Sequence, residues 1–325
     1  MALILGIETT CDETGIALVE DGHKIISHHV LSQASDHERF GGVFPELASR
    51  LHVPALPLLF NKTLEESGKS AEDIDAIAVA YGPGLVGALL AGLQFAKGLC
   101  IGLKKPLIAV NHVEAHLFAA AMNKNPEFPA LGVVVSGGHT TLLLIKAIGF
   151  YEVLGETIDD AIGESFDKVA IMLGLSYPGG PLIEKIAKTG NPHLYPFKSG
   201  KVQERPLSFS FSGLKTAVLQ MLKNYPEAHP ADVAASFQEC VFKDLLSKIS
   251  MTLQKTGARS LLVGGGVANN KRLQSLLQEL PLPVFLPPPE LTLDNAAMIA
   301  GLGYHNLLHK GPSPLSLEPA TRIAF

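Results

Sequence analysis

Apolar and polar positions alternate along the chain in two successive series of strand and helix patterns. The first series predicts strands in residues 2–9, 14–20, 24–31, 73–80 and 106–110, and helices in 45–67, from about 84 to 102, and from about 112. After a loop at 123–130 the pattern starts again. It predicts three strands in 131–157, helices near 159–173, 179–189, 213–223 and 229–256, strands near 260–264 and 282–286, and a last helix from about residue 294. The sequence therefore predicts an α/β protein made of two similar halves.

The length of the chain also favours two domains. A chain of 325 residues exceeds the size at which a single hydrophobic core usually stops growing. We expect a first lobe of residues 1–125 with 291–325, the latter bringing a C-terminal helix back, and a second lobe of residues 126–290. In such folds, ligands bind where strand ends and glycine turns converge.

Charge and cysteine content exclude several classes of protein. The net charge of −5 provides no overall basic surface for nucleic acid, so an RNA contact needs a local patch, for which Lys198, Lys201, Arg205 and Lys215 are candidates. Three scattered cysteines exclude a disulfide framework and a thiolate zinc site. Glycines and polar residues interrupt the apolar stretch at 85–103, which indicates a buried helix and not a membrane span. With no signal-peptide pattern at residues 2–7, we expect a cytoplasmic protein.

Two histidines follow the strand at 106–110. His112 and His116 are four residues apart, so both lie on one helix face and can share a metal ion. Glu114, between them, points away, and the general base of a metallopeptidase is therefore missing. Asp294 is the candidate third ligand. The alternatives are two ordinary helical histidines and, for Asp294, a helix N-cap.

Glycine turns follow two of the predicted strands. The run from Val135 through Ser136, Gly137, Gly138 and His139 joins two strands, and open backbone N–H groups there suit phosphate oxygens, although a plain hairpin turn has the same composition. The run 264–270, GGGVANN, ends a strand and opens a helix, whose N-terminus attracts anions. It lacks the spacing of a Walker or dinucleotide motif.

Acidic residues cluster at two further places. Asp12 and Glu13 lie in the turn after the first buried strand, where they can bind a cation or orient an incoming amine, unless they are solvated loop acids. Asp160, Glu164 and Asp167 are spaced as one stripe of a helix, for which a solvated face is the alternative, and the open turn YPGGP follows at 177–181.

Taken together, these motifs resemble those of the tRNA N6-adenosine threonylcarbamoyltransferase family, once called O-sialoglycoprotein endopeptidases. The resemblance runs in order over essentially the whole chain and rests on GIETTCDETG, GGVFPELASR, YGPGLVGALLAG, NHVEAH, VSGGHT, GETIDDAIGESFDK, YPGGP, FSFSGLK, GGGVANN and DNAAMIA. Two small departures from the family pattern, Ala296 for glycine and Ala268 for serine, touch no expected ligand.

The resemblance implies an actin/sugar-kinase/Hsp70-like fold of two duplicated ribonuclease-H-like lobes around a nucleotide cleft. It implies transfer of a threonylcarbamoyl group from threonylcarbamoyl-adenylate to N6 of the adenosine next to the anticodon, in tRNAs that read codons beginning with A. It also implies one Fe²⁺ or Zn²⁺ ion per subunit, a paralogous dimerisation subunit and a small ATPase as partners. The metal ligands map onto His112, His116 and Asp294, and the substrate-binding positions map onto Val135, Ser136, Gly137, Gly138, His139, Asp167, Gly180 and Asn270.

This reaction needs no protein nucleophile because the adenylate is already activated. The hypothesis is that the metal acts as Lewis acid or template, Gly137 and Gly138 cradle the phosphate, Asn270 contacts the adenylate, and Asp12 or Glu13 orients the amine. Two other functions stay open at this point: a metallopeptidase, and a nucleotide-gated binding module without transferase activity.

Overall fold

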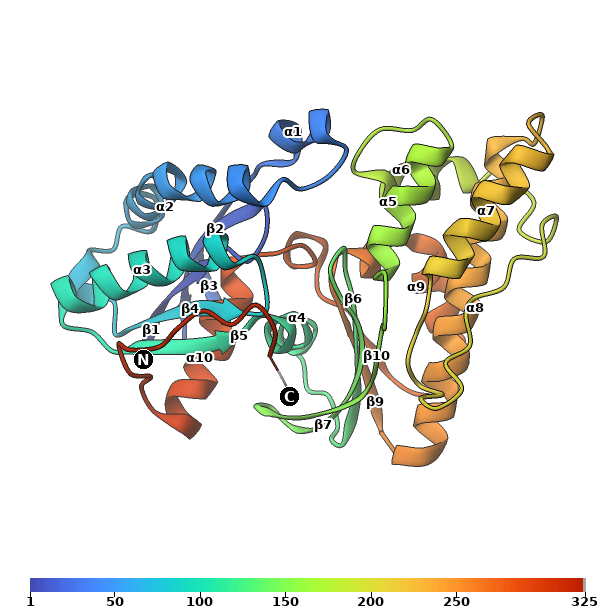
Figure 1. Ribbon diagram of the computed structural model, residues 1–325. Coiled ribbons are helices and arrows are strands. Elements are labelled where there is room, and N and C mark those ends of the chain that lie inside the picture. The colour runs from blue at the N-terminus through green and yellow to red at the C-terminus, as the bar shows by residue number, and fades with distance from the viewer. Residues whose placement is uncertain (324–325) are drawn as a thin grey trace. The chain divides into compact units, whose positions relative to one another are not determined.

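Each half of the chain is built on a five-stranded sheet whose central strand consists of buried residues. The computed structural model describes residues 1–323, in which these strands are β1 (Leu3–Glu8) and β6 (Ala130–Val135) (Figure 1). Contacts divide the chain into unit 1, residues 1–125 with the segment from Pro287 onward, and unit 2, Pro126–Leu286. The return to unit 1 thus begins at Pro287, ahead of the residue 291 that we expected.

Unit 1 consists of one sheet and of helices that come from both ends of its sequence. Its strands are β1, β2 (Glu13–Glu20), β3 (Lys24–Ser32), β4 (Ala76–Gly82) and β5 (Leu107–Asn111). Its α-helices are α1 (Ala34–His37), α2 (Pro45–Ser67), α3 (Val86–Leu103), α4 (His112–Ala121) and α10 (Ala296–Lys310), with short 3₁₀ turns η1 (Glu38–Phe40), η2 (Ala71–Asp73) and η4 (Pro289–Leu291).

Unit 2 repeats this plan with longer helices. Its strands are β6, β7 (Thr140–Ala147), β8 (Phe150–Glu156), β9 (Ser260–Gly264) and β10 (Val284–Phe285). Its helices are α5 (Ile162–Met172), α6 (Gly179–Ala187), α7 (Ser212–Asn224), α8 (Pro230–Thr256), α9 (Lys271–Leu277) and the 3₁₀ turn η3 (Gly266–Asn269). Phenylalanines of α5 and α8 and of the segment before α7 fill its core.

The two sheets have the same topology. The strand order is β3-β2-β1-β4-β5 in unit 1 and, read from its other edge, β8-β7-β6-β9-β10 in unit 2. In both, the first three strands pair antiparallel, and the last two add in parallel to the central strand. The predicted duplication of an α/β unit is therefore confirmed.

Helix α10 packs directly against the central sheet of unit 1, because glycines leave room for it. A Cβ atom on Gly6 would lie 2.2 Å from the carbonyl oxygen of Ala296, and one on Gly15 would lie 2.9 Å from the Ala296 nitrogen. The bare backbone of β1 and β2 thus sets how closely the first turn of α10 approaches, and with it the position of the residues just before the helix.

We predict that Gly6→Ala destabilises the protein. The new methyl group would meet main-chain atoms that cannot rotate away, and overpacking of this kind lowers the free energy of unfolding by roughly 1–3 kcal/mol or more. Gly98→Ala is the matched control, since a Cβ there meets nothing within 4 Å on α3 and should raise stability by up to about 1 kcal/mol. Denaturant unfolding of both variants measures the difference, and equal stabilities would contradict this packing account.

The apolar stretch at 85–103 forms helix α3, which is buried on one face only. Leu93, Ala96 and Cys100 join the core of unit 1, whereas Val86 and Ile101 are exposed. Among residues 1–323, α3 alone is long and apolar enough to span a membrane by length and composition. Its inner face packs against α2 and the sheet. The predicted buried helix is thus correct for that face and wrong for the other.

Candidate metal centre and substrate-binding turns

The histidine pair projects from the first turns of α4. Strand β5 ends at Asn111, whose side chain caps α4 by accepting hydrogen bonds from the N–H groups of Val113 and Glu114, at 2.9 and 3.3 Å. His112 and His116 then fall one turn apart on the same face, with ring centroids 4.6 Å apart. Both are almost completely buried, at 3% and 1% exposed. The helix therefore presents two imidazoles inside unit 1 and not toward solvent.

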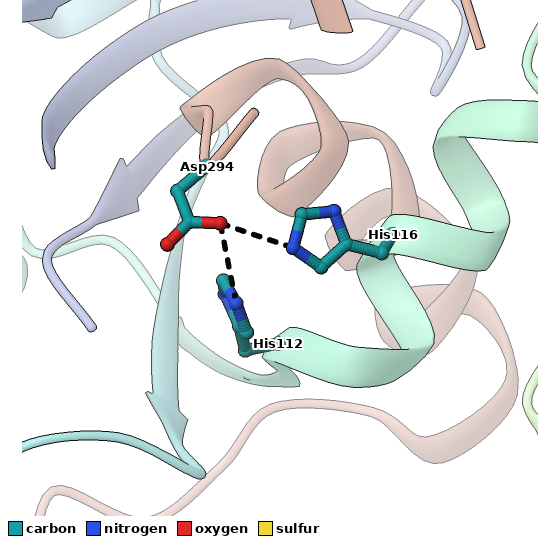
Figure 2. A group of neighbouring side chains, drawn as sticks. All are labelled: His112, His116 and Asp294. Carbon is teal, nitrogen blue, oxygen red and sulfur yellow. Dashed lines mark hydrogen bonds and ion pairs between the residues drawn. The ribbon is translucent and has the colours of Figure 1, made fainter. Parts of the chain in front are cut away.

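Asp294 completes a three-residue group with these histidines (Figure 2). Its Oδ1 lies 3.0 Å from Nε2 of His116 and 3.5 Å from Nε2 of His112. One potential ligand atom from each residue falls within 4.8 Å of the others. The N-cap of α10 is Asn295, whose side chain accepts from the Met298 N–H at 3.0 Å. The alternative that Asp294 is itself the cap is therefore wrong, and its carboxylate is directed at the histidines.

Glu8 contacts His112 at Nδ1, the ring nitrogen that does not face Asp294, a role that the sequence did not reveal. Glu8 is fully buried at the end of β1, and its Oε2 lies 2.9 Å from Nδ1 of His112. Its Oε1 accepts the N–H of Thr10 at 2.6 Å. A carboxylate at Nδ1 keeps a proton there, so Nε2, which faces Asp294, is the nitrogen that can bind a metal ion once it has lost its own proton. By contrast, Nδ1 of His116 is buried without a hydrogen-bond partner within residues 1–323.

The electrostatics of the group suit a cation. Burial alone would lower the pKa of His112, but the carboxylates of Glu8 and Asp294 together raise it to about 9. Two imidazole nitrogens and one carboxylate oxygen form a donor set that divalent transition metals accept, with further positions open to water or substrate. The residues present therefore fit a resident metal ion.

The acids of the first turn lie in the same electrostatic environment. Asp12 is 8% exposed, so it is no solvated loop acid. Burial, followed by the charges of Asp294 and Asp12, raises the pKa of Glu13 to about 9. The same causes, with burial first, hold the pKa of the Cys11 thiol well above its usual value. At neutral pH Glu13 therefore carries a proton while no cation neutralises Asp294, and it also accepts a hydrogen bond from Ser32 at 3.2 Å.

Glu114 points to the opposite side of α4, as predicted. It lines a separate small cavity of unit 1 with Tyr81, Asn306 and Lys310. Burial raises the pKa of Glu114 to about 7, against the opposing effect of the Lys310 charge. Glu114 therefore does not supply a carboxylate in the position of a peptidase general base.

In unit 2, the turn after β6 leaves two glycines open. Ser136 closes this turn by donating its N–H to the carbonyl of His139 at 2.8 Å and by accepting the His139 N–H on its Oγ at 3.0 Å. Gly137 and Gly138 are exposed, and a Cβ atom on either would meet nothing within 4 Å. Gly163, at the start of α5, donates its N–H to the carbonyl of Ser136, so the positive end of this helix adjoins the turn.

Asp167 and Gly180 are also brought together. Oδ1 of Asp167 accepts the N–H groups of Gly179 and Gly180, at 2.7 and 3.3 Å, at the start of α6. The predicted stripe of three acids is wrong, because α5 begins at Ile162 and Asp160 lies before it. Asp160 instead forms ion pairs with Lys168 and with Lys215.

Because Lys215 is engaged in this way and only 18% of its side chain is exposed, it does not belong to a basic surface patch. Lys198, Lys201 and Arg205 are exposed.

Asn270 is held by the protein on both sides of its amide. Its oxygen caps α9 by accepting from Arg272 and Leu273, and its nitrogen donates to Gln238 at 2.8 Å. The glycine run before it ends β9 and leads through the 3₁₀ turn η3 into the seven-residue α9, so the predicted strand end and helix start are confirmed, with a 3₁₀ turn between them. Gly265, with φ of +91°, would carry a Cβ only 2.5 Å from the carbonyl of Val135. This turn therefore lies against the end of β6.

Comparison with known proteins gives one consistent family. The family model for tRNA N6-adenosine threonylcarbamoyltransferase matches residues 24–301. A protein of that name from Protochlamydia amoebophila (strain UWE25) is 50% identical and aligns with 98% of this chain and 97% of its own length. Another, from Chlamydia abortus (strain DSM 27085 / S26/3), is 52% identical over 93% of this chain and 90% of its own length.

Solved structures share the fold at low sequence identity. Component A of (R)-2-hydroxyglutaryl-CoA dehydratase from Acidaminococcus fermentans aligns with 95% of this chain and all of its own, with a TM-score of 0.57 and 14% identity. Full-length HypF, in a phosphate- and nucleotide-bound form, aligns with 96% of this chain and 47% of its own, with a TM-score of 0.63 and 13% identity. These likenesses show that the chain has the predicted actin/sugar-kinase-like fold.

Proposed function

The chain belongs to the tRNA N6-adenosine threonylcarbamoyltransferase family and is a tRNA-modifying transferase, and from this premise we propose which residues carry the reaction. In that reaction N6 of the adenosine next to the anticodon attacks the carbamoyl carbon of threonylcarbamoyl-adenylate. The new N–C bond forms as the bond to the phosphate oxygen breaks, AMP leaves, and N6 loses a proton. The observation that supports the proposal best is the close approach of the buried His112 and His116 to the partly buried Asp294.

One Fe²⁺ or Zn²⁺ ion per subunit is the proposed occupant of this group. His112 and His116 would bind it through Nε2 and Asp294 through a carboxylate oxygen, and Glu8 keeps His112 in the required tautomer. A bound divalent ion would supply Lewis acidity and orient oxygen atoms of the substrate. The two candidate metals share this donor set, so the metal content of purified protein has to decide between them.

The nucleotide part of the substrate is assigned to unit 2. The proposed binding positions are Val135, Ser136, Gly137, Gly138, His139, Asp167, Gly180 and Asn270. The open N–H groups of Gly137 and Gly138, beside the N-terminus of α5, suit a phosphate group. Asp167 holds the N–H groups of the Gly179–Gly180 turn, and Asn270 fixes the start of α9. Part of the proposed contribution of Asp167 and Asn270 is therefore to stabilise the backbone conformation of these turns.

Asp12 and Glu13 are proposed to orient the attacking amine. We expect Asp12→Ala to lower the transfer rate by roughly 10- to 100-fold while the metal content stays unchanged, because an oriented acceptor for the N6 hydrogens is lost. Glu13→Ala should have the same direction of effect. Single-turnover transfer to an unmodified tRNA measures both variants, with Asp21→Ala, on the turn after β2, as control. Full rates in both variants would remove these acids from the mechanism.

The proposed partners are tRNA, a paralogous dimerisation subunit and a small ATPase, in the cytoplasm. With Lys215 bound to Asp160, three of the four candidate basic residues remain exposed on the loop before α7: Lys198, Lys201 and Arg205. Three exposed cations form a small footprint for an RNA, so we propose that the partners supply the remaining positive surface.

A reconstituted assay tests the function. Purified chain, partner subunits, threonylcarbamoyl-adenylate and unmodified tRNA are expected to give threonylcarbamoyl-adenosine in the tRNA, and removal of the metal should abolish the product. Metal-dependent cleavage of protein substrates with no tRNA product would instead establish the metallopeptidase alternative. Bound adenylate without any tRNA product would establish the nucleotide-gated binding module.

A further inference from the structure

Two stacked phenylalanine rings are exposed on the segment between β3 and α2. The ring centroids of Phe40 and Phe44 are 5.1 Å apart with the planes at 17°, and the residues are 48% and 45% exposed. The guanidinium of Arg39 lies 4.8 Å from the centroid of the Phe40 ring. Gly41, with φ of +69°, adopts the left-handed conformation that reverses the chain after Phe40 and brings Phe44 back onto it. We call Arg39, Phe40 and Phe44 the aromatic platform.

A buried hydrogen-bond network fixes this segment to the turn that carries Asp12. Gln33, 3% exposed, donates its backbone N–H to the carbonyl of Asp12 at 3.0 Å. Its side-chain oxygen lies 3.2 Å from Nε2 of the fully buried His37, and Nδ1 of His37 accepts the Phe44 N–H at 3.2 Å. A single neutral tautomer of His37, with the proton on Nε2, satisfies both contacts.

His52 ties the same network to the neighbouring residue of the turn. It is fully buried and donates from Nε2 to the carbonyl of Cys11 at 3.0 Å, while its Nδ1 accepts from Thr14 Oγ1 at 2.7 Å and lies 3.4 Å from the Gln33 side chain. Burial lowers the pKa of His52, which keeps it neutral. The aromatic platform is therefore not an unsupported loop tip, because hydrogen bonds to the carbonyls of Cys11 and Asp12 fix its position.

We propose that the aromatic platform stacks against an unpaired base of the tRNA anticodon loop. Proteins recognise single-stranded RNA by stacking splayed bases on aromatic rings and guanidinium planes, and the platform offers both. Glu38 precedes Arg39 directly and Asp36 lies three residues before it, so the segment has no positive excess with which to bind the phosphate backbone. Its rings are thus suited to contact a base. The inference rests on the proposed function, because it takes tRNA as the substrate.

Fluorescent anticodon stem–loop RNAs test this stacking directly. 2-Aminopurine is placed at each loop position in turn, and its fluorescence and the dissociation constant are measured at two salt concentrations with the full-length chain, carrying its native metal and assembled with the partner subunits. We expect quenching at one position with the native protein. Phe40→Ala and Phe44→Ala should weaken binding by about 5- to 150-fold, since a base–aromatic stack is worth about 1–3 kcal/mol, and should abolish that quenching.

Three comparisons keep the result interpretable. Phe44→Trp should retain binding, and Phe150→Ala, which removes another exposed phenylalanine on β8 of unit 2, should leave it unchanged. The salt dependence of binding should be the same in native and platform variants, because no phosphate contact is lost. Melting curves verify that each variant is folded, and the corresponding leucine variant, Phe40→Leu or Phe44→Leu, which fills the space without an aromatic face, replaces any alanine variant that is not.

The proposal would be overturned if both alanine variants bound RNA within twofold of the native affinity. It would also be overturned if these variants bound RNA normally but lost binding to a protein partner. Transfer by the native chain to whole tRNA is measured in parallel. If the native chain transfers and the platform variants bind RNA normally, only the platform proposal fails. If the native chain does not transfer, the proposed function fails as well.

Discussion

Asp294→Asn is expected to yield a folded protein that no longer retains its metal ion and no longer modifies tRNA. The substitution keeps the shape of the side chain but removes the anionic oxygen that lies 3.0 Å from His116 and 3.5 Å from His112. A site with only two histidines binds divalent metals weakly. Metal affinity should fall by more than about 100-fold. Loss of a residue that only supports a ligand, without binding the metal itself, lowers the affinity by about 100-fold at most. Metal analysis after purification without chelator, beside the transfer rate, gives the measurement.

His112→Ala should behave in the same way, and the control is His305→Ala. His305 lies on α10, packs against the Phe118 ring and has no place in the three-residue group. The account of the site would be wrong if Asp294→Asn kept one metal ion per chain, or if His305→Ala lost the metal as completely as His112→Ala.

Glu8→Ala is expected to give the second-largest effect, although Glu8 would not touch the metal. Without its carboxylate, Nδ1 of His112 loses the contact at 2.9 Å, and the Thr10 hydroxyl at 3.3 Å is a weaker partner, so the imidazole can rotate or change tautomer. Loss of such an outer-sphere partner lowers metal affinity by roughly 10- to 100-fold. Competition with a chromophoric zinc chelator measures the affinity, and ¹⁵N shifts of the imidazole report which nitrogen of His112 carries the proton.

Glu239→Gln separates this effect from the general loss of a buried carboxylate. Glu239 is 5% exposed in unit 2 and forms an ion pair with Arg272 at 3.0 Å, so its replacement affects stability but not the metal. Native zinc affinity in Glu8→Ala, or an unchanged proton position on His112, would show that Glu8 has only a structural role.

Periodicity sufficed to predict the helices and the histidine pair, because both depend on local geometry. Residues four apart on a helix share a face wherever that helix lies, so His112 and His116 could be paired from the sequence. The direction of Glu114 follows from the same rule, and the separate cavity that it lines agrees with it. Similarly, the two series of strand patterns predicted a duplication that the matching strand orders confirm.

Contacts between distant segments could not be predicted in this way. Glu8 and His112 are 104 residues apart and meet only because β1 and β5 belong to one sheet and end at the same edge. A polar residue at the end of a buried strand is the signal that could have identified Glu8. Lys215 was assigned to a basic patch for a related reason, since its charge is visible in the sequence but its partner Asp160, 55 residues away, is not.

The boundaries of short elements were the other source of error. The run 264–270 was correctly predicted to end a strand and open a helix, but the pattern did not show the 3₁₀ turn that comes first, before α9 begins at Lys271. The Asn270 side chain can cap only the helix that follows it. Helix α5 begins later than expected for a comparable reason, because the carboxylate of Asp159 accepts hydrogen bonds from Ser210, Phe211 and Ser212 instead of lying in a helix.

The returning segment of unit 1 has a consequence for the order of events during synthesis. A ribosome releases α4, with both histidines, long before Pro287, and the whole of unit 2 emerges in between. The nascent chain therefore has two imidazoles and no third ligand until Asp294 is released and α10 packs over Gly6. Metal affinity should appear only near the end of translation, so a truncated or stalled chain would not compete for the metal supply of the cell.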